Sequence, residues 1–285
     1  MSVADRYLPV WILIAMAVGL LLGRTVPGLG TALSALEISG VSLPILIGLL
    51  VMMYPPLAKV RFDKTAEVAA DRRLMVLSLT LNWLVGPALM FALAWIFLPD
   101  EPELRTGLII VGLARCIAMV LVWTELSCAD REVTAVLVAV NALFQVLMFG
   151  VLGWFYLQVL PGWLGLATTT AEFSFTAIVT SVLVFLGVPL LAGLVSRWIG
   201  ERRRGREWYE SRFLPAISPL AMIGLLYTIV LLFCLQGEQI TAQPLTVARV
   251  ALPLLIYFVG MFALALLASR AAGLGYARST SVAFT

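Results

Sequence analysis

Met90-Phe91-Ala92-Leu93-Ala94 recurs as Met261-Phe262-Ala263-Leu264-Ala265, and Ile47-Gly48-Leu49-Leu50 recurs as Ile223-Gly224-Leu225-Leu226. The copies are 171 and 176 residues apart, and in both cases the chain advances by five apolar segments from one copy to the next. Because five is odd, the second copy crosses a membrane in the opposite sense to the first. Inverted repeats of this kind build many secondary transporters. The repeat therefore predicts a fold of two oppositely oriented five-helix halves.

The composition is that of an integral membrane protein. Of the 285 residues, 62% are hydrophobic and only 12% are charged, and the mean hydropathy is +1.03. Soluble domains carry about 25% charged residues, spread along the chain. The apolar segments do not alternate every second residue as barrel strands do, so we expect an all-α polytopic membrane protein. The expected helices are residues 8–22, 41–58, 74–98, 106–126, 133–159, 173–199, 216–235 and 247–269.

The domain organisation follows from the repeat. We expect one membrane domain over residues 1–285, with a first five-helix repeat at 1–159 and a second at 173–285. The second repeat is expected to be incomplete, because Tyr276–Thr285 would only begin a ninth span. The prediction is thus a ten-span fold, present here as about eight spans plus the start of the ninth.

Basic residues indicate the orientation. Fifteen of the 19 lysines and arginines lie on the side of the N-terminus, three lie on the opposite side, and Arg115 lies within a segment. Cytoplasmic loops carry the excess of basic residues in membrane proteins. We therefore expect a multi-pass protein of the cell (inner) membrane with a cytoplasmic N-terminus.

Several kinds of chemistry are excluded. The chain has no histidine, and its three cysteines lack the CxxC spacing of a zinc site. All five aspartates lie in loops or tails, and no GxxxxGK[ST], HExxH or GxSxG motif is present. We therefore expect no enzyme activity, no cofactor and no nucleic-acid partner, and ATP-driven pumping by this chain is excluded.

The segment Gly112-Leu113-Ala114-Arg115-Cys116-Ile117-Ala118-Met119 places a charge in the middle of the fourth span. An arginine there costs about 2.5 to 3.5 kcal/mol on insertion scales and must face protein or water. It either satisfies the carbonyls of a broken helix or acts at a substrate site. Cys116 is either a small apolar residue or a metal-binding thiolate, which a neighbouring cation favours.

Two further features admit two interpretations each. Asn141 and Gln145 are four residues apart on one face of the fifth span, where they either join helices or line a site. Tyr54-Pro55-Pro56 disrupts the end of the second span, because proline cannot continue the helical hydrogen bonding. This disruption fits either a hinge or a simple end of the helix.

Three stretches carry a resemblance to a known family: Gly48 to Val60, Gly112 to Trp123, and Asp130-Arg131-Glu132 with Leu137 to Val146. Together they resemble the arsenite efflux permeases of the bile acid/arsenite/riboflavin transporter superfamily. The resemblance implies a ten-span inverted repeat, with spans one, two, six and seven in a panel domain and spans four and nine crossing in a core domain. It also implies proton-coupled export of arsenite.

The expected site residues follow from both lines of reasoning. Cys116 is the expected arsenite ligand, and Arg115, Trp123, Asn141 and Gln145 complete the expected substrate site. The expected helix breaks are Gly112, Pro55 and Pro56. The transported species would be arsenite, with antimonite as a second cargo, and protons.

The chain departs from the family in one respect. The family has a glutamate in an Asn-Asn-Phe-Glu segment of span nine, and this chain ends at Thr285 before such a segment. The chain as given would therefore lack that coupling carboxylate. Two alternatives stay open: a sodium-coupled symporter for an organic anion from the same superfamily, and a membrane scaffold or pore subunit without a coupled cycle.

Overall fold

The structure is a computed structural model that describes residues 7–26, 28–29, 33, 35–38, 41–59, 70–115, 120, 123–124, 126–166, 180 and 183–285. Most of these residues are helical, as the hydropathy predicts. The exception is a short antiparallel pair of strands, β1 (Glu37–Ile38) and β2 (Val41–Ser42), in which Glu37 pairs with Ser42. The predicted all-α membrane class is confirmed.

Within the described residues, six helical stretches are long and apolar enough to cross a bilayer. They are Leu8–Thr25, Arg72–Phe97, Arg131–Trp163, Leu183–Arg204, Arg206–Gly237 and Pro244–Ala271. The helix Leu43–Ala58 is apolar but shorter. These stretches account for seven of the eight expected segments, and the remaining one is the fourth.

The segment predicted over 106–126, with an expected break at Gly112, is not one continuous helix. Helix α8 (Pro102–Leu113) ends at Leu113, and Ala114 has an extended backbone with φ −77° and ψ 138°.

Two other boundaries also differ from the prediction. Residues 41–42 form a strand rather than the start of a helix, and the predicted loop at 236–246 shrinks to Gln243 between α15 (Leu214–Ala242) and α16 (Pro244–Ala271). Hydropathy averages over a turn or more, so it does not locate the residue at which a helix ends.

The chain divides into two compact units, each built from both halves of the predicted repeat. Unit 1 consists of Met1–Lys59 and Phe185–Pro244, and unit 2 consists of Val60–Val184 and Leu245–Thr285. Unit 1 thus contains spans one, two, six and seven, which is the grouping that the family resemblance implies for the panel domain. The expected division into repeats at 1–159 and 173–285 concerns the internal similarity of the sequence, not the compact units, and it stays a prediction.

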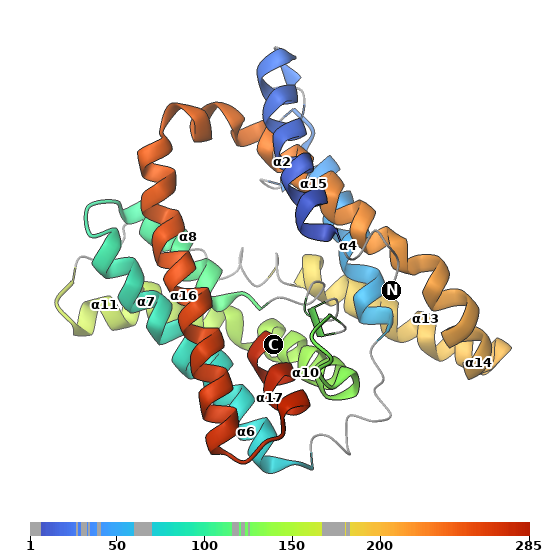
Figure 1. Cartoon of the computed structure of the whole chain (residues 1–285). Coiled ribbons are helices and arrows are strands. Elements are labelled where there is room, and N and C mark those ends of the chain that lie inside the picture. The colour runs from blue at the N-terminus through green and yellow to red at the C-terminus, as the bar shows by residue number, and fades with distance from the viewer. Residues whose placement is uncertain are drawn as a thin grey trace. The chain divides into compact units, whose positions relative to one another are not determined.

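In unit 1, helices α2 and α4 pack along α15, and α13 packs against α4 (Figure 1). The two copies of the Ile-Gly-Leu-Leu repeat meet at the crossing of α4 and α15. A Cβ atom on Gly48 would lie 2.5 Å from Thr228 Oγ1, and one on Gly224 would lie 2.8 Å from the backbone nitrogen of Met52. Glycine at both positions allows the backbones to approach closely, as in other membrane helix pairs. The bounds of the elements of this unit are α2 Leu8–Thr25, α4 Leu43–Ala58, α13 Val188–Arg204, α14 Arg206–Trp208, η4 Tyr209–Phe213 and α15 Leu214–Ala242.

Helix α4 continues through Pro55 and Pro56 and ends at Ala58. The carbonyl groups at its end find partners outside the helix. The Tyr209 hydroxyl donates to the Ala58 carbonyl at 3.3 Å, and Arg197 Nη1 donates to the Lys59 carbonyl at 3.4 Å. A cation at the C-terminus of a helix also complements the negative end of its dipole. The prolines therefore lie in the last turn of a helix whose end is held by other elements of unit 1.

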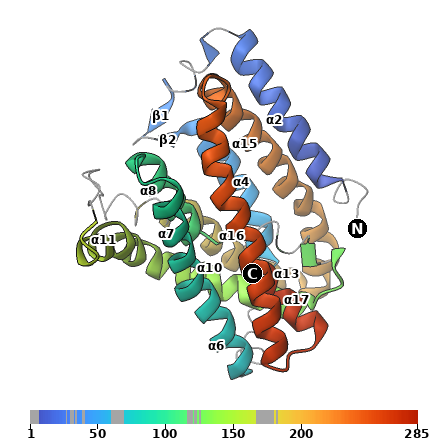
Figure 2. The ribbon, with the colours of Figure 1, turned by 60° about the vertical axis from the view of Figure 1, so that its left-hand side comes forward.

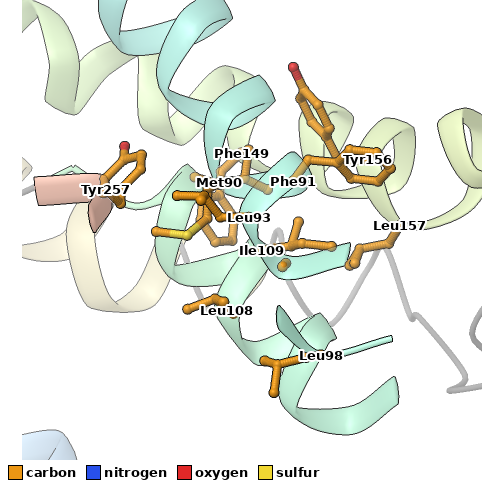
Figure 3. Packing of buried hydrophobic residues seen from close by; sticks show 12 residues of the cluster. Met90, Phe91, Leu93, Leu98, Leu108, Ile109, Phe149, Tyr156, Leu157 and Tyr257 are labelled. Atoms are coloured by element: carbon orange, nitrogen blue, oxygen red, sulfur yellow. The ribbon is translucent and has the colours of Figure 1, made fainter. Parts of the chain in front are cut away.

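Unit 2 is organised around an apolar cluster of α7, α8, α10, η2 and α16. Its buried members include Met90, Phe91, Leu113 and Phe149. Tyr257 belongs to the same cluster and lies at its edge (Figure 3). Helices α7 and α8 are neighbours in both views of the chain (Figure 2). The elements of this unit are α6 Arg72–Thr80, η1 Leu81–Val85, α7 Gly86–Phe97, α8 Pro102–Leu113, α10 Arg131–Trp154, η2 Phe155–Val159, α11 Leu160–Trp163, α16 Pro244–Ala271 and α17 Tyr276–Phe284, and η3 Leu183–Gly187 begins at the boundary with unit 1.

The last helix of the chain, α17, packs on the start of α10 (Figure 1). Asp130 caps α10 by accepting from the backbone nitrogens of Glu132 and Val133, each at 3.1 Å. Its backbone nitrogen donates to the Ala277 carbonyl at 3.2 Å, and the Ser281 hydroxyl donates to its carbonyl at 2.9 Å. Asp130 thus both caps the start of α10 and binds α17 through its backbone.

Candidate functional site

The candidate site is built around the end of helix α8. Gly112 lies one residue before that end and packs directly on the Met90 side chain of α7, where a Cβ atom would collide. The extended Ala114 then carries the chain out of the helix at Arg115. A half-helix that ends at membrane depth leaves carbonyl groups without intrahelical partners. Such ends need donors from elsewhere in the protein.

The partly buried Arg115 supplies the donors. Its Nη2 donates to the Gly112 carbonyl at 2.8 Å, and its Nη1 donates to the Tyr257 hydroxyl at 3.2 Å. The guanidinium therefore lies at the negative end of the α8 dipole, where a cation is stabilised. Its Nε is buried and has no hydrogen-bond partner within the described part of the chain. The positive charge is thus held in place and keeps one donor unused.

Span five provides two amides for this region. The Gln145 side-chain oxygen accepts from the Arg115 backbone nitrogen at 3.0 Å. Asn141, which is only 2% exposed, accepts from Trp83 Nε1 at 3.1 Å and donates to the Thr285 carbonyl at 3.4 Å. Gln145 therefore holds the chain just after the end of α8, and Asn141 joins α10 to Trp83 and to Thr285. Helices α8 and α17 both pack against α10, the helix that carries these two amides.

The structure brings together only some of the expected site residues. Gly112, Arg115 and Gln145 are in direct contact, and Asn141 is joined to them through Trp83, whose ring centroid lies 5.8 Å from the Arg115 Cζ atom. Cys116 lies outside the described residues. Trp123 is partly exposed, and its backbone carbonyl accepts a hydrogen bond from the backbone nitrogen of Ser127. Pro55 and Pro56 belong to unit 1, and their expected role as a helix break stays a prediction.

Sequence reasoning missed three residues of this region: Trp83, Gly86 and Tyr257. Trp83 and Tyr257 are polar-tipped aromatic residues inside apolar spans, a signal that could have been used. Gly86 gave no signal, because its importance depends on which side chains face it.

The described part of the chain contains no group of three or more His, Cys, Asp and Glu side chains that could hold a metal ion. Its carboxylates lie at or near helix ends or between helices. One of them, Asp100, accepts from Arg249 Nη1 at 3.1 Å, and this hydrogen bond lowers the pKa of the Asp100 carboxyl below its usual value of 3.8. The site at Arg115 is therefore one of a fixed cation, two amides and an aromatic face.

A half-helix that ends beside polar side chains, within an inverted repeat, is typical of one class of protein, the secondary membrane transporters. Comparison with known proteins agrees with this class. Residues 46–243 match the model of the sodium bile acid symporter family. The chain belongs to this family, which consists of transporters and not of enzymes.

Three relatives were found. Over its whole length the chain is 71% identical to the arsenical-resistance protein Acr3 of Corynebacterium glutamicum, of which it covers 77%. It is 34% identical to an uncharacterized transporter of Synechocystis, with 90% of the chain and 70% of that protein aligned. It is also 31% identical to the arsenical-resistance protein Acr3 of Alkaliphilus metalliredigens, with 92% and 73% aligned.

Proposed function

We propose that the protein exports arsenite from the cytoplasm in exchange for protons, with antimonite as a second cargo. The observation that carries the proposal is the break after α8, because the residue that follows the held Arg115 is Cys116. The 71% identity to an arsenical-resistance protein supports arsenite as the cargo.

The chemistry of the cargo fits this set of groups. Arsenite is thiophilic and has hydroxyl groups, so a carrier needs a soft ligand together with polar groups for the hydroxyls. A cysteine sulfur is such a ligand. Arg115, Asn141 and Gln145 offer donors and acceptors for oxygen atoms. A single thiolate ligand would also bind more weakly than a three-thiol site, which suits a carrier that must release its cargo.

Export requires that the site open to each side in turn. In other transporters with inverted repeats, one bundle moves against another around a site near the bilayer midplane. Two compact units that each combine both repeats would suit such a movement. Proton exchange is proposed from the family resemblance.

The proposed direction of transport depends on a cytoplasmic N-terminus. Two ion pairs of unit 2 are compatible with that orientation, because each joins residues that the charge pattern assigns to one side. Asp71 pairs with Arg278 at 3.1 Å on the proposed cytoplasmic side, and Asp100 pairs with Arg249 on the opposite side.

The proposal is tested by arsenite uptake into everted vesicles from cells that lack other arsenite efflux systems and express the full-length protein. An imposed proton gradient should drive uptake, and nigericin, which collapses that gradient, should stop it. Uptake driven by a sodium gradient alone would instead favour the sodium-coupled alternative. Absence of arsenite uptake by well-expressed protein under both gradients would refute the proposed function.

A further inference from the structure

The Arg115 guanidinium is hydrogen-bonded to a side chain of the second repeat, Tyr257. Tyr257 lies in the middle of α16 and is 6% exposed. Its hydroxyl oxygen accepts from Arg115 Nη1 at 3.2 Å. A phenol that accepts from a cation keeps its own hydrogen available for another acceptor.

The position opposite Tyr257 is occupied by glycine. A Cβ atom on Gly86 would lie 3.0 Å from the Tyr257 hydroxyl oxygen and 3.1 Å from Arg115 Nη2. Both distances are shorter than ordinary van der Waals contacts, so any side chain at position 86 would press on the hydrogen-bonded pair. Gly86 thus leaves the space in which the guanidinium and the phenol meet.

Gly86 and Tyr257 are also equivalent positions of the inverted repeat. They are 171 residues apart, and each precedes a methionine of the repeated motif, Met90 or Met261, by one helical turn. The two repeats therefore face each other here with the smallest residue on one side and a large polar-tipped residue on the other. An exact repeat would have the same residue at both positions, either two large side chains or two glycines. The difference between Gly86 and Tyr257 instead places a single hydroxyl group beside the Arg115 guanidinium.

We propose that Tyr257 is a further residue of the cargo site: its oxygen positions Arg115, and its hydrogen is donated to an oxygen atom of the transported arsenite. The buried Arg115 Nε, which has no partner in the described part of the chain, is a second donor beside it. Two neighbouring donors suit a cargo with several hydroxyl oxygens. This inference rests on the proposed function.

The test measures the half-saturation concentration for arsenite in the everted-vesicle assay with full-length protein. Tyr257→Phe removes one hydrogen bond to a charged group and one donor, so the half-saturation concentration should rise about tenfold, with a smaller change in the maximal rate. The matched control is Tyr276→Phe, because the Tyr276 hydroxyl donates to the Ser127 carbonyl away from this site. An unchanged value for Tyr257→Phe, or an equal rise in the control, would overturn the proposal.

A second pair of variants tests the space at position 86. Gly86→Ala should impair uptake in the wild-type background and should be tolerated better together with Tyr257→Phe, because the double variant lacks the crowded oxygen. Gly260→Ala, one turn from Tyr257, is the control, since within the described residues no atom outside its own stretch of helix lies within 4 Å of its Cβ position. Equal damage from Gly86→Ala in both backgrounds would contradict the assigned contact.

A measurement without arsenite separates this inference from the proposed function. Thermal unfolding of Arg115→Ala, Tyr257→Phe and the double variant should show non-additive losses, because the two residues share one hydrogen bond. If the losses are non-additive but the wild type takes up no arsenite, the proposed function is refuted, whereas the hydrogen bond between Arg115 and Tyr257 is supported. Additive losses of stability would refute the interaction between Arg115 and Tyr257.

Discussion

Replacing Gln145 should show how much the side chains of span five contribute to holding the broken helix. In the structure the Gln145 side-chain oxygen accepts from the Arg115 backbone nitrogen at 3.0 Å, just after the end of α8. Gln145→Leu keeps the volume of the side chain and leaves that N–H without its partner. An unsatisfied buried donor costs about 1 to 3 kcal/mol, and the partial exposure of Gln145 favours the lower half of this range.

The assay is thermal unfolding of the full-length protein in detergent. At an unfolding entropy of about 2.1 cal/mol/K per residue, a loss of about 1 to 2 kcal/mol lowers the melting temperature of a chain of this length by about 2 to 4 °C. Gln145→Glu is the matched control, because a carboxylate oxygen accepts from the same N–H and lies beside a cation. Equal melting temperatures for Gln145→Leu and the wild type, or equal losses for both variants, would refute the assigned role.

Three further predictions address the cysteines, the pH response and the topology. Cys116→Ser should abolish arsenite uptake, because a hydroxyl oxygen is a harder and un-ionised donor, while Cys128→Ser, at an exposed turn, should leave uptake intact; normal uptake by the first variant would contradict this. Because the pKa of Asp100 is lowered by Arg249, their pairing stabilises the protein above the pKa of the unfolded carboxyl and is lost as the pH falls through the lowered value. The difference in melting temperature between wild type and Asp100→Asn should therefore shrink from pH 7 to pH 3, and a constant difference would contradict the assignment. Single cysteines within Arg197–Arg212 should react with a membrane-impermeant label only in everted vesicles, and labelling in intact cells would reverse the proposed topology.

Much of the site could be anticipated from residue types alone. Arg115, Asn141 and Gln145 are polar residues in apolar spans, where each must find partners. The sequence could not say which partners. Arg115 is bonded to Gly112 in its own segment, to Gln145 thirty residues on and to Tyr257 in the other repeat. Such pairings depend on which helix faces meet, and periodicity does not encode that.

By itself the sequence determined the membrane class, the approximate positions of the spans and the inverted repeat, because burial in hydrocarbon demands long apolar helices with internally satisfied backbones. Only the tertiary structure decided that α8 ends at Leu113 and that Gly86 and Tyr257 meet beside Arg115. A helix can end in the middle of a span only where other elements supply donors for its carbonyl groups. At α8 the donor to the Gly112 carbonyl is Arg115, three residues on, and Arg115 is itself held by two acceptors distant in the chain, Gln145 and Tyr257. The break therefore depends on the packing of the protein as well as on the segment that contains it.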